Sequence, residues 1–231
     1  MTHVKNTVLQ YCQALDIGEG WTWEKSKKRY RSEPFKGVKI YIETLWSFIG
    51  GHGKSRPSVT VIAKDYTDIH KMAGLSRVNW AWHYQLPYYT RWHPFEGGIL
   101  PRFQVWDSHE IVSEVDSWYH VSDIDVVMEK MIKSGMELIN REFDFSSREV
   151  FMKSLVLDDD DPRLGNMQAM HNIGITRQCI LRILQGDYEF VQTAFERFEG
   201  YLSHAKRDIP LILNNLDGIK AHVKKSELSV F

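Results

Sequence analysis

The amino-acid sequence predicts an α+β protein, with an antiparallel sheet in the N-terminal half packed with an α-helical C-terminal half. Two periodicities predict this class. Between residues 21 and 106, apolar residues alternate with polar ones in several short runs, which is typical of half-buried strands. After residue 122 they recur at helical spacing. All eight tryptophans precede residue 119, so the composition also changes near the middle of the chain.

The N-terminal half is expected to begin with a helix over residues 3–15, where apolar residues fall on one helical face. Residues 21–24, 38–43 and 59–61 then alternate between apolar and polar side chains, which predicts three strands. A short helix is expected near residues 68–73.

The strongest strand pattern covers residues 78–86, where every second residue is apolar. A further strand near residues 103–106 is expected to complete one antiparallel sheet of five or six strands. We expect Trp80, Trp82 and Ile40 to be buried against helices, because an apolar row on a sheet needs a covering layer.

The C-terminal half is expected to contain a series of amphipathic helices, which are marked by capping signals. The first of these helices is expected over residues 122–141, and the second is expected to start at the Ser146/Glu149 capping box. A third is expected to end at Gly186, a fourth to cover residues 190–202, and the last to start at Pro210.

The charge is unevenly distributed along the chain. Residues 1–106 hold 15 Lys and Arg against 8 Asp and Glu, whereas residues 107–231 hold 14 against 22. We therefore distinguish an aromatic-rich, net basic sheet region at 1–118 from a helical, net acidic region at 119–231, within one compact unit. Two separable domains are the alternative, although no linker rich in Pro, Gly or Ser marks a boundary.

The N-terminus lacks the long apolar run of a signal peptide. The longest uncharged apolar run, residues 44–51, is far shorter than the roughly 20 residues that cross a bilayer. The sequence therefore predicts a cytoplasmic protein with no membrane role.

Residues 50–55 read Gly-Gly-His-Gly-Lys-Ser and end like a phosphate-binding loop. Phe48 stands where such a loop needs its first glycine, and Pro57 prevents an immediate helix. We expect a flexible basic hairpin loop here. An anion-binding nest of glycine amides, helped by Lys54 and Arg56, is the alternative.

No motif specifies a reaction, a cofactor or a metal. Cys12 and Cys179 are expected to be buried thiols, and residues 158–161 to be a solvated acidic loop. The middle of the chain interleaves histidines with carboxylates without the spacing of a ligand set. These residues are His83, His93, His109, His120, Asp107, Glu110, Asp123 and Asp125.

A basic cluster next to aromatic residues occupies the expected hairpin at 25–39. Its members are Lys25, Lys27, Lys28, Arg29, Arg31, Lys36 and Lys39. Three interpretations are open: a solvated hairpin, a surface for an acidic protein partner, and a site where single-stranded nucleic acid places its phosphates on cations and its bases on aromatic rings.

A second candidate surface lies at residues 84–95, interpreted as a stiff loop between prolines. Tyrosine, tryptophan and arginine are enriched at the centres of interfaces. The candidate binding residues are Tyr88, Tyr89, Arg91, Trp92 and His93. A lid over the core of the sheet is the other interpretation.

These features favour a non-enzymatic cytoplasmic interaction protein, such as an inhibitor or immunity-type protein that occludes a partner with an acidic surface. A nucleic-acid or nucleotide binder using the basic hairpin is the second hypothesis. An unrecognised hydrolase using the histidines and carboxylates of residues 83–125 is the third.

Overall fold

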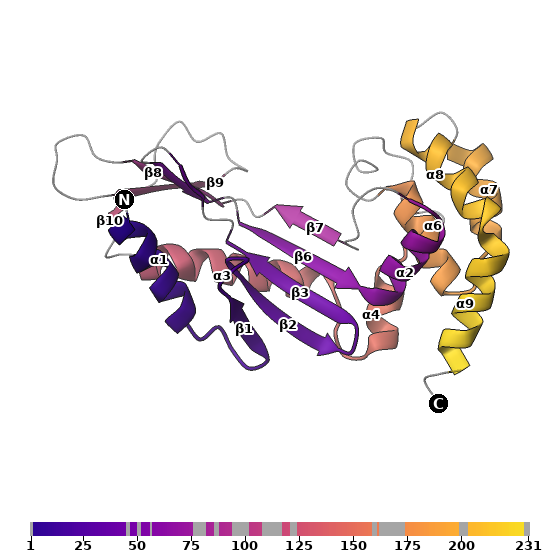
Figure 1. Cartoon of the computed structure of the whole chain (residues 1–231), viewed down its shortest axis with the longest axis horizontal. Coiled ribbons are helices and arrows are strands. Elements are labelled where there is room, and N and C mark those ends of the chain that lie inside the picture. The colour runs from indigo at the N-terminus through magenta and orange to yellow at the C-terminus, as the bar shows by residue number, and fades with distance from the viewer. Residues whose placement is uncertain are drawn as a thin grey trace. The chain divides into compact units, whose positions relative to one another are not determined.

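The computed structural model describes residues 2–44, 47–49, 52–55, 57–75, 82–85, 88–93, 102–107, 117–120, 124–158, 161, 174–198 and 203–228. The chain divides into two compact units (Figure 1). Unit 1 comprises residues 1–61 and 82–142, and unit 2 comprises residues 62–81 and 143–231. Each unit contains residues from both halves of the chain, so the boundary between the units does not coincide with the change in composition at residue 118.

Unit 1 contains a five-stranded sheet, sheet A, whose strand order is β1-β2-β3-β6-β7. Its strands are β1 Trp21–Glu24, β2 Arg29–Phe35, β3 Val38–Glu43, β6 Ser58–Ala63 and β7 Trp82–Gln85. The pairs β1–β2, β2–β3 and β6–β7 are antiparallel. The α+β class and the antiparallel sheet of the N-terminal half are therefore confirmed.

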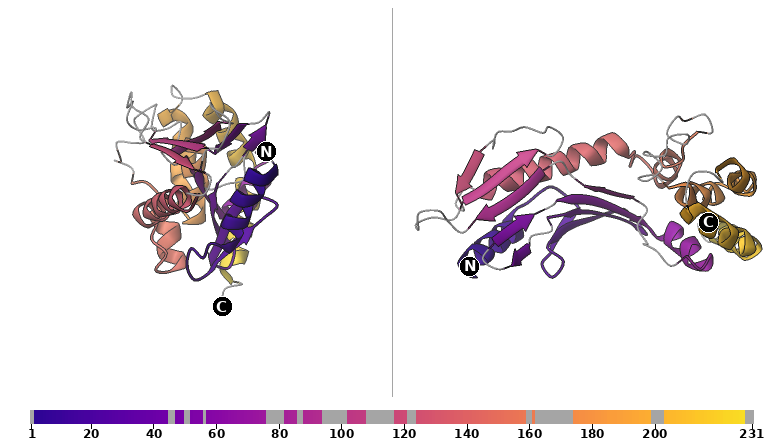
Figure 2. Two further views of the ribbon diagram at one scale, coloured as in Figure 1. Left: turned by 90° about the vertical axis from the view of Figure 1, so that its left-hand side faces the viewer. Right: turned by 90° about the horizontal axis from the view of Figure 1, so that it is seen from above.

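Two helices cover one face of sheet A: α1 (Thr2–Ala14) and α3 (Ile124–Glu142). The Tyr30 hydroxyl of β2 donates to the Cys12 carbonyl of α1 at 2.9 Å. Gly135 of α3 approaches Ile42 of β3 so closely that a Cβ there would lie 3.3 Å from two side-chain carbons of Ile42. Figure 2 shows α3 running along the sheet. Close helix–sheet packing explains the glycine in the middle of a helix, where glycine is otherwise unfavourable.

The core of unit 1 follows the predicted alternation. The inward positions of the central strands are buried, including Ile40, which is 4 % exposed as expected. The side chains of Trp80 and Trp82 lie outside the described part of the chain, so their burial stays a prediction.

The remaining strands of unit 1 form a second sheet, sheet B, in the order β10-β9-β8-β5-β4. They are β4 Ser47–Ile49, β5 His52–Ser55, β8 Tyr88–His93, β9 Arg102–Asp107 and β10 Ser117–His120. The expectation of one sheet of five or six strands was wrong. The stretch expected to be a loop at residues 84–95 contains β8, the central strand of sheet B, because alternating Tyr, Thr and Trp satisfy strand propensity despite the flanking prolines.

Apart from Ile62 and Ala63, the last two residues of β6, the regular secondary structure in the described part of unit 2 is helical. Its helices are α2 Lys64–Met72, α4 Arg148–Ser154, α6 Ile175–Leu184, α7 Glu189–Phe198, α8 Ser203–Asn214 and α9 Leu216–Leu228. Among the described residues, no helix of the chain is long and apolar enough to cross a membrane.

The helix ends show which capping predictions held. Gly186 has φ +80° and follows α6 as predicted, and the amides of Gly186 and Asp187 donate to Ile183 and Arg182. This pair of bonds is a Schellman motif. The N-cap of α4 is Ser147 rather than Ser146, since its side chain accepts from the Val150 amide at 3.1 Å.

Pro210 was expected to start the last helix, and this prediction was wrong. It lies inside α8, and α9 follows it. Proline is commonest in the first turn because it lacks an N–H, and it costs one intrahelical hydrogen bond further along. The buried residues Ile209 and Ile212 on either side supply compensating packing in α8.

A buried polar network holds the segment after α4 against α6. Gln178 is 1 % exposed, accepts from the Leu157 amide at 3.0 Å and donates to the Leu155 carbonyl at 3.3 Å. Arg182 adds a hydrogen bond to the Leu157 carbonyl at 2.5 Å and an ion pair with Asp187 at 2.9 Å. Backbone groups that have no helical partner are thereby satisfied by side chains.

Unit 2 should lose stability as the pH falls through about 6.5 because of His70. His70 is 5 % exposed and its buried Nδ1 has no hydrogen-bond partner in the described structure. Burial lowers the pKa of His70 from its ordinary value of 6.5, and the charge of Asp208 opposes this only in part. The folded state therefore binds the proton less readily than the unfolded state, so stability is present above about pH 6.5 and declines until the lowered pKa is passed.

The measurement is urea unfolding of the wild type and of His70→Phe at about pH 7.5 and 5.5. The variant should show a smaller loss of stability between the two pH values. If the stability of His70→Phe depended on pH as strongly as that of the wild type, groups other than His70 would be responsible for the loss. Tyr66, whose ring centroid lies 6.1 Å from that of His70, does not titrate in this range because burial raises its pKa.

Candidate functional site

The basic hairpin folds around a four-residue turn between β1 and β2. The amides of Lys27 and Lys28 donate to the carbonyls of Glu24 and Lys25, at 3.0 and 3.4 Å. Lys28 adopts a left-handed backbone with φ +53°, and its carbonyl accepts from both the amide and the hydroxyl of Thr44. The turn is therefore held by hydrogen bonds within it and by hydrogen bonds from Thr44.

Arg29 lies at the centre of a row of interacting polar side chains across sheet A, formed with Glu24 and Glu43, which we call the polar ladder. Its Nε is 2.6 Å from a carboxylate oxygen of Glu24, and its Nη1 is 3.4 Å from Glu43. The guanidinium carbon lies 3.6 Å from the centroid of the Tyr41 ring. Burial by itself would lower the pKa of Arg29, but the hydrogen bond that it donates to Glu24 and nearby negative charge raise the pKa overall.

The ladder continues through Glu43 to β6. The second carboxylate oxygen of Glu43 accepts from the hydroxyls of Thr60 at 3.0 Å and Ser58 at 3.3 Å. Glu43 of β3 is thus held by side chains of the two neighbouring strands, β2 and β6. Arg29 and Glu43 are therefore ion-pair partners within the sheet.

Arg31 is also occupied within the hairpin. It contacts Glu33 and lies 3.8 Å from Glu24. The pKa of Glu33 is lowered by the hydrogen bond from the Gly37 amide and by Arg31. Both predicted arginines of the cluster therefore form ion pairs that sequence analysis did not anticipate. The signal was available in principle for Arg29, since Glu24 and Glu43 both lie opposite it in the antiparallel register. Glu33 lies two residues after Arg31 on β2 itself.

The lysines of the cluster behave differently. Within the described part of the chain, Lys25, Lys27 and Lys36 are exposed and form no ion pair. Lys28 and Lys39 are half-buried. Residues 21–43 hold seven Lys and Arg against three Glu, so the hairpin keeps a net positive charge after internal pairing.

The other candidate binding residues lie in sheet B. Lys54 is on β5, and residues Tyr88, Tyr89, Arg91, Trp92 and His93 are all on β8. Arg56 lies outside the described residues. The register brings Lys54 directly opposite Arg91, although the sequence had placed them in two unrelated loops.

The histidines and carboxylates proposed for hydrolysis are only partly brought together. His83 is on β7 of sheet A, whereas His93 and His120 are on β8 and β10 of sheet B. His109, Glu110 and Asp123 lie outside the described residues. Among the residues that the structure describes, no group of three or more His, Cys, Asp or Glu is placed to hold a metal ion.

The two cysteines are poor nucleophiles. Both are fully buried, and burial raises the pKa of the Cys12 thiol and of the Cys179 thiol to about 12. Cys12 lies 3.8 Å from the sulfur of Met128. A thiol that stays protonated near neutral pH does not attack substrates.

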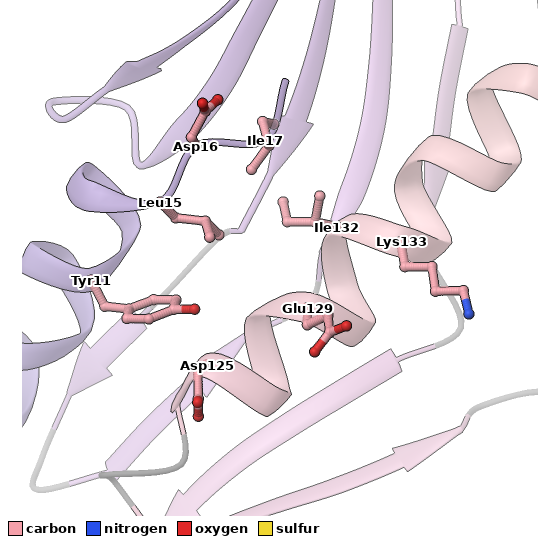
Figure 3. A pocket seen from close by; sticks show the side chains of 8 residues that line it. All are labelled: Tyr11, Leu15, Asp16, Ile17, Asp125, Glu129, Ile132 and Lys133. Atoms are coloured by element: carbon pink, nitrogen blue, oxygen red, sulfur yellow. The ribbon is translucent and has the colours of Figure 1, made fainter. Parts of the chain in front are cut away.

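A pocket of about 590 Å³ lies between α1 and α3 within unit 1 (Figure 3). Its lining residues are Tyr11, Leu15, Asp16, Ile17, Asp125, Glu129, Ile132 and Lys133. The Tyr11 ring extends from α1 toward the carboxylates of α3. Burial, followed by the charge of Asp125, raises the pKa of Tyr11. The phenol therefore stays neutral, and the pocket is acidic.

Comparison of the chain with protein-family models, with curated proteins and with solved structures finds no match.

Proposed function

We propose that the chain is a non-enzymatic cytoplasmic interaction protein that binds an acidic protein surface through the lysines of the β1–β2 and β2–β3 turns. An inhibitor or immunity-type role, in which binding occludes the partner, fits this mode of action. The observation that carries the proposal is a contrast between the arginines and the lysines of residues 25–39. Arg29 and Arg31 form ion pairs with glutamates of the same sheet, whereas Lys25, Lys27 and Lys36 are exposed.

Internal pairing gives the surface two properties that favour binding. The ladder through Glu24, Arg29 and Glu43 fixes the backbone that presents the lysines, so little conformational freedom is lost on association. The exposed ammonium groups are not committed to partners within the sheet. Lys25 and Lys27 lie in the β1–β2 turn, and Lys36 lies in the β2–β3 turn at the other end of β2. Positive charges exposed on one protein accelerate its encounter with an oppositely charged surface.

The proposal predicts an effect on the rate of association. Lys25→Glu, Lys27→Glu and Lys36→Glu combined should slow association with the partner by about tenfold or more, and should change dissociation much less. Arg29 is left unchanged because reversing its charge would disrupt the ladder. The partner is first identified by crosslinking in the native host and mass spectrometry, and rates are then measured by surface plasmon resonance at about 50 and 200 mM salt.

A matched control reverses three exposed lysines of unit 2, namely Lys153, Lys224 and Lys225. It changes the net charge equally and should alter the association rate by less than about threefold. Equal slowing by the two triple variants, or an association rate that does not depend on salt, would refute a hairpin-directed interaction.

A further inference from the structure

The pocket between α1 and α3 has an aliphatic wall. Leu15, Ile17 and Ile132 line it, and their side chains are half-buried or, for Ile132, 9 % exposed. The volume of about 590 Å³ lies within the range of roughly 300 to 1,000 Å³ that is typical of small-molecule sites. Aliphatic surface in a concave site of this size favours an organic ligand, because covering it removes apolar area from water.

The same pocket carries an excess of negative charge. Its charged lining residues are the carboxylates of Asp16, Asp125 and Glu129 and the ammonium group of Lys133, which together give a formal charge of −2. All four residues are exposed. The Lys133 side chain extends away from the Tyr11 ring, so the space beside that ring faces carboxylates (Figure 3).

Two of these carboxylates lie together on one face of α3. Asp125 and Glu129 are one helical turn apart, a spacing at which like charges repel each other. Burial is the largest cause of the raised pKa of Tyr11, and the charges of both carboxylates raise it further. Within the described part of the chain, Glu129 forms no hydrogen bond or ion pair, although Lys133 follows it by one turn. Internal pairing therefore leaves negative charge in the pocket.

The carboxylates are too dispersed to share one metal ion. No three acidic groups of the described residues, which include all three of this pocket, are placed to hold such an ion. Asp16 lies in the segment after α1, and its Oδ1 accepts from the Gly18 amide at 2.9 Å. Negative charge is thus distributed along the aliphatic wall, which suits an extended ligand with separated cationic groups. A single lysine side chain of a partner would neutralise only part of it.

We propose that the pocket between α1 and α3 binds an aliphatic diamine or polyamine. Its ammonium groups pair with the carboxylates of Asp125, Glu129 and Asp16, and the methylene chain between them covers the aliphatic wall. The Tyr11 ring extends toward the carboxylates of α3 (Figure 3) and offers an aromatic surface to one ammonium group. This site is separate from the basic hairpin and does not rest on the function proposed for it.

The test is isothermal titration calorimetry of the full chain with hexamethylenediamine. The diamine should bind with a dissociation constant of about 1 mM or tighter. Hexylamine, which has the same carbon chain but one ammonium group, should bind at least about fivefold more weakly, because one ion pair is lost. The affinity for the diamine should fall between about 50 and 200 mM salt, because exposed charges are screened.

Glutamates of α3 supply a variant and its matched control. Glu129→Gln should weaken diamine binding by about three- to fivefold, and adding Asp125→Asn should bring the loss to about tenfold. Glu137 is also an exposed carboxylate of α3 that forms no ion pair in the described structure, but it does not line the pocket. Glu137→Gln removes the same charge and should change the affinity by less than about 1.5-fold.

A further variant separates the charge of the pocket from damage to the fold. Lys133→Gln removes the ammonium group from the lining and should tighten diamine binding by about twofold. Because Lys133 is exposed, the melting temperature should change by less than about 2 °C. A variant that disturbed the pocket would weaken binding instead. Opposite shifts for Glu129→Gln and Lys133→Gln therefore identify charge as the cause.

Three outcomes would overturn the proposal: a dissociation constant for the diamine weaker than about 1 mM, equal affinity for hexylamine, and equal weakening by Glu129→Gln and Glu137→Gln. The second would show that one cationic group is sufficient, as on a lysine side chain. The third would show that the diamine associates with the acidic surface of α3 in general. None of them bears on the hairpin, whose function is tested by the association rates with its protein partner.

Discussion

Replacing Phe151 by alanine should lower the free energy of unfolding by about 3 to 5 kcal/mol. Phe151 of α4 is completely buried in unit 2. Its ring stacks on Phe145 with centroids 4.9 Å apart and lies 6.2 Å from the ring of Phe143. Truncation removes the free energy gained by transferring the ring from water to the core. It also leaves a cavity that the neighbouring aromatic rings fill only in part. Urea unfolding followed by circular dichroism measures the loss.

The adjacent residue supplies the control for this measurement. Val150 belongs to the same helix and is 39 % exposed, so Val150→Ala should change stability by less than about 0.5 kcal/mol. A comparable loss in both variants would indicate that α4 as a whole is marginal, and would contradict the aromatic cluster as its anchor.

Local periodicity was sufficient to predict much of the fold. The structure has α1 at Thr2–Ala14, β3 at Val38–Glu43 and α3 at Ile124–Glu142, all close to the predicted limits. In each of these elements one face is apolar and buried against the rest of unit 1, so the period of the sequence matches the period of burial. The left-handed cap at Gly186 was predictable for a similar local reason, since glycine adopts positive φ at little cost.

Sequence reasoning failed where the outcome depends on pairing between distant segments. The division into two sheets is set by which strands pair, and β5 pairs with β8 more than thirty residues away. Nothing local distinguishes that arrangement from a single larger sheet. At Pro210 the local rule was wrong because packing in α8 outweighs the loss of one hydrogen bond.

The candidate site was predictable to a similar degree. The basic cluster was visible in the sequence, but the pairing of Arg29 and Arg31 with glutamates depends on strand register. The opposed positions of Lys54 and Arg91 required the complete order of sheet B. Composition identifies which residue types are present, whereas tertiary pairing determines which of them remain for a ligand.

Replacing Ile42 by alanine should lower the free energy of unfolding by about 2 to 5 kcal/mol. Ile42 is completely buried on β3, and its side chain fills the space beneath Gly135 of α3. The lost methyl and methylene groups leave a cavity between the helix and sheet A, which the glycine cannot fill. Urea unfolding of the variant and the wild type gives the difference.

A second substitution should partly repair the Ile42 variant. In the wild type, a Cβ at position 135 would lie 3.3 to 3.5 Å from the three outer carbons of Ile42, so crowding offsets the gain of about 1 kcal/mol that alanine brings to a helix interior. Ile42→Ala removes all three carbons. Gly135→Ala should therefore stabilise the Ile42→Ala protein more than the wild type, by about 0.5 kcal/mol or more in a double-mutant cycle. Gly218→Ala in α9, where no atom lies within 4 Å of the new carbon, should have the same effect in both backgrounds. Additive effects of the Ile42 and Gly135 changes would show that α3 does not pack on β3 at this point.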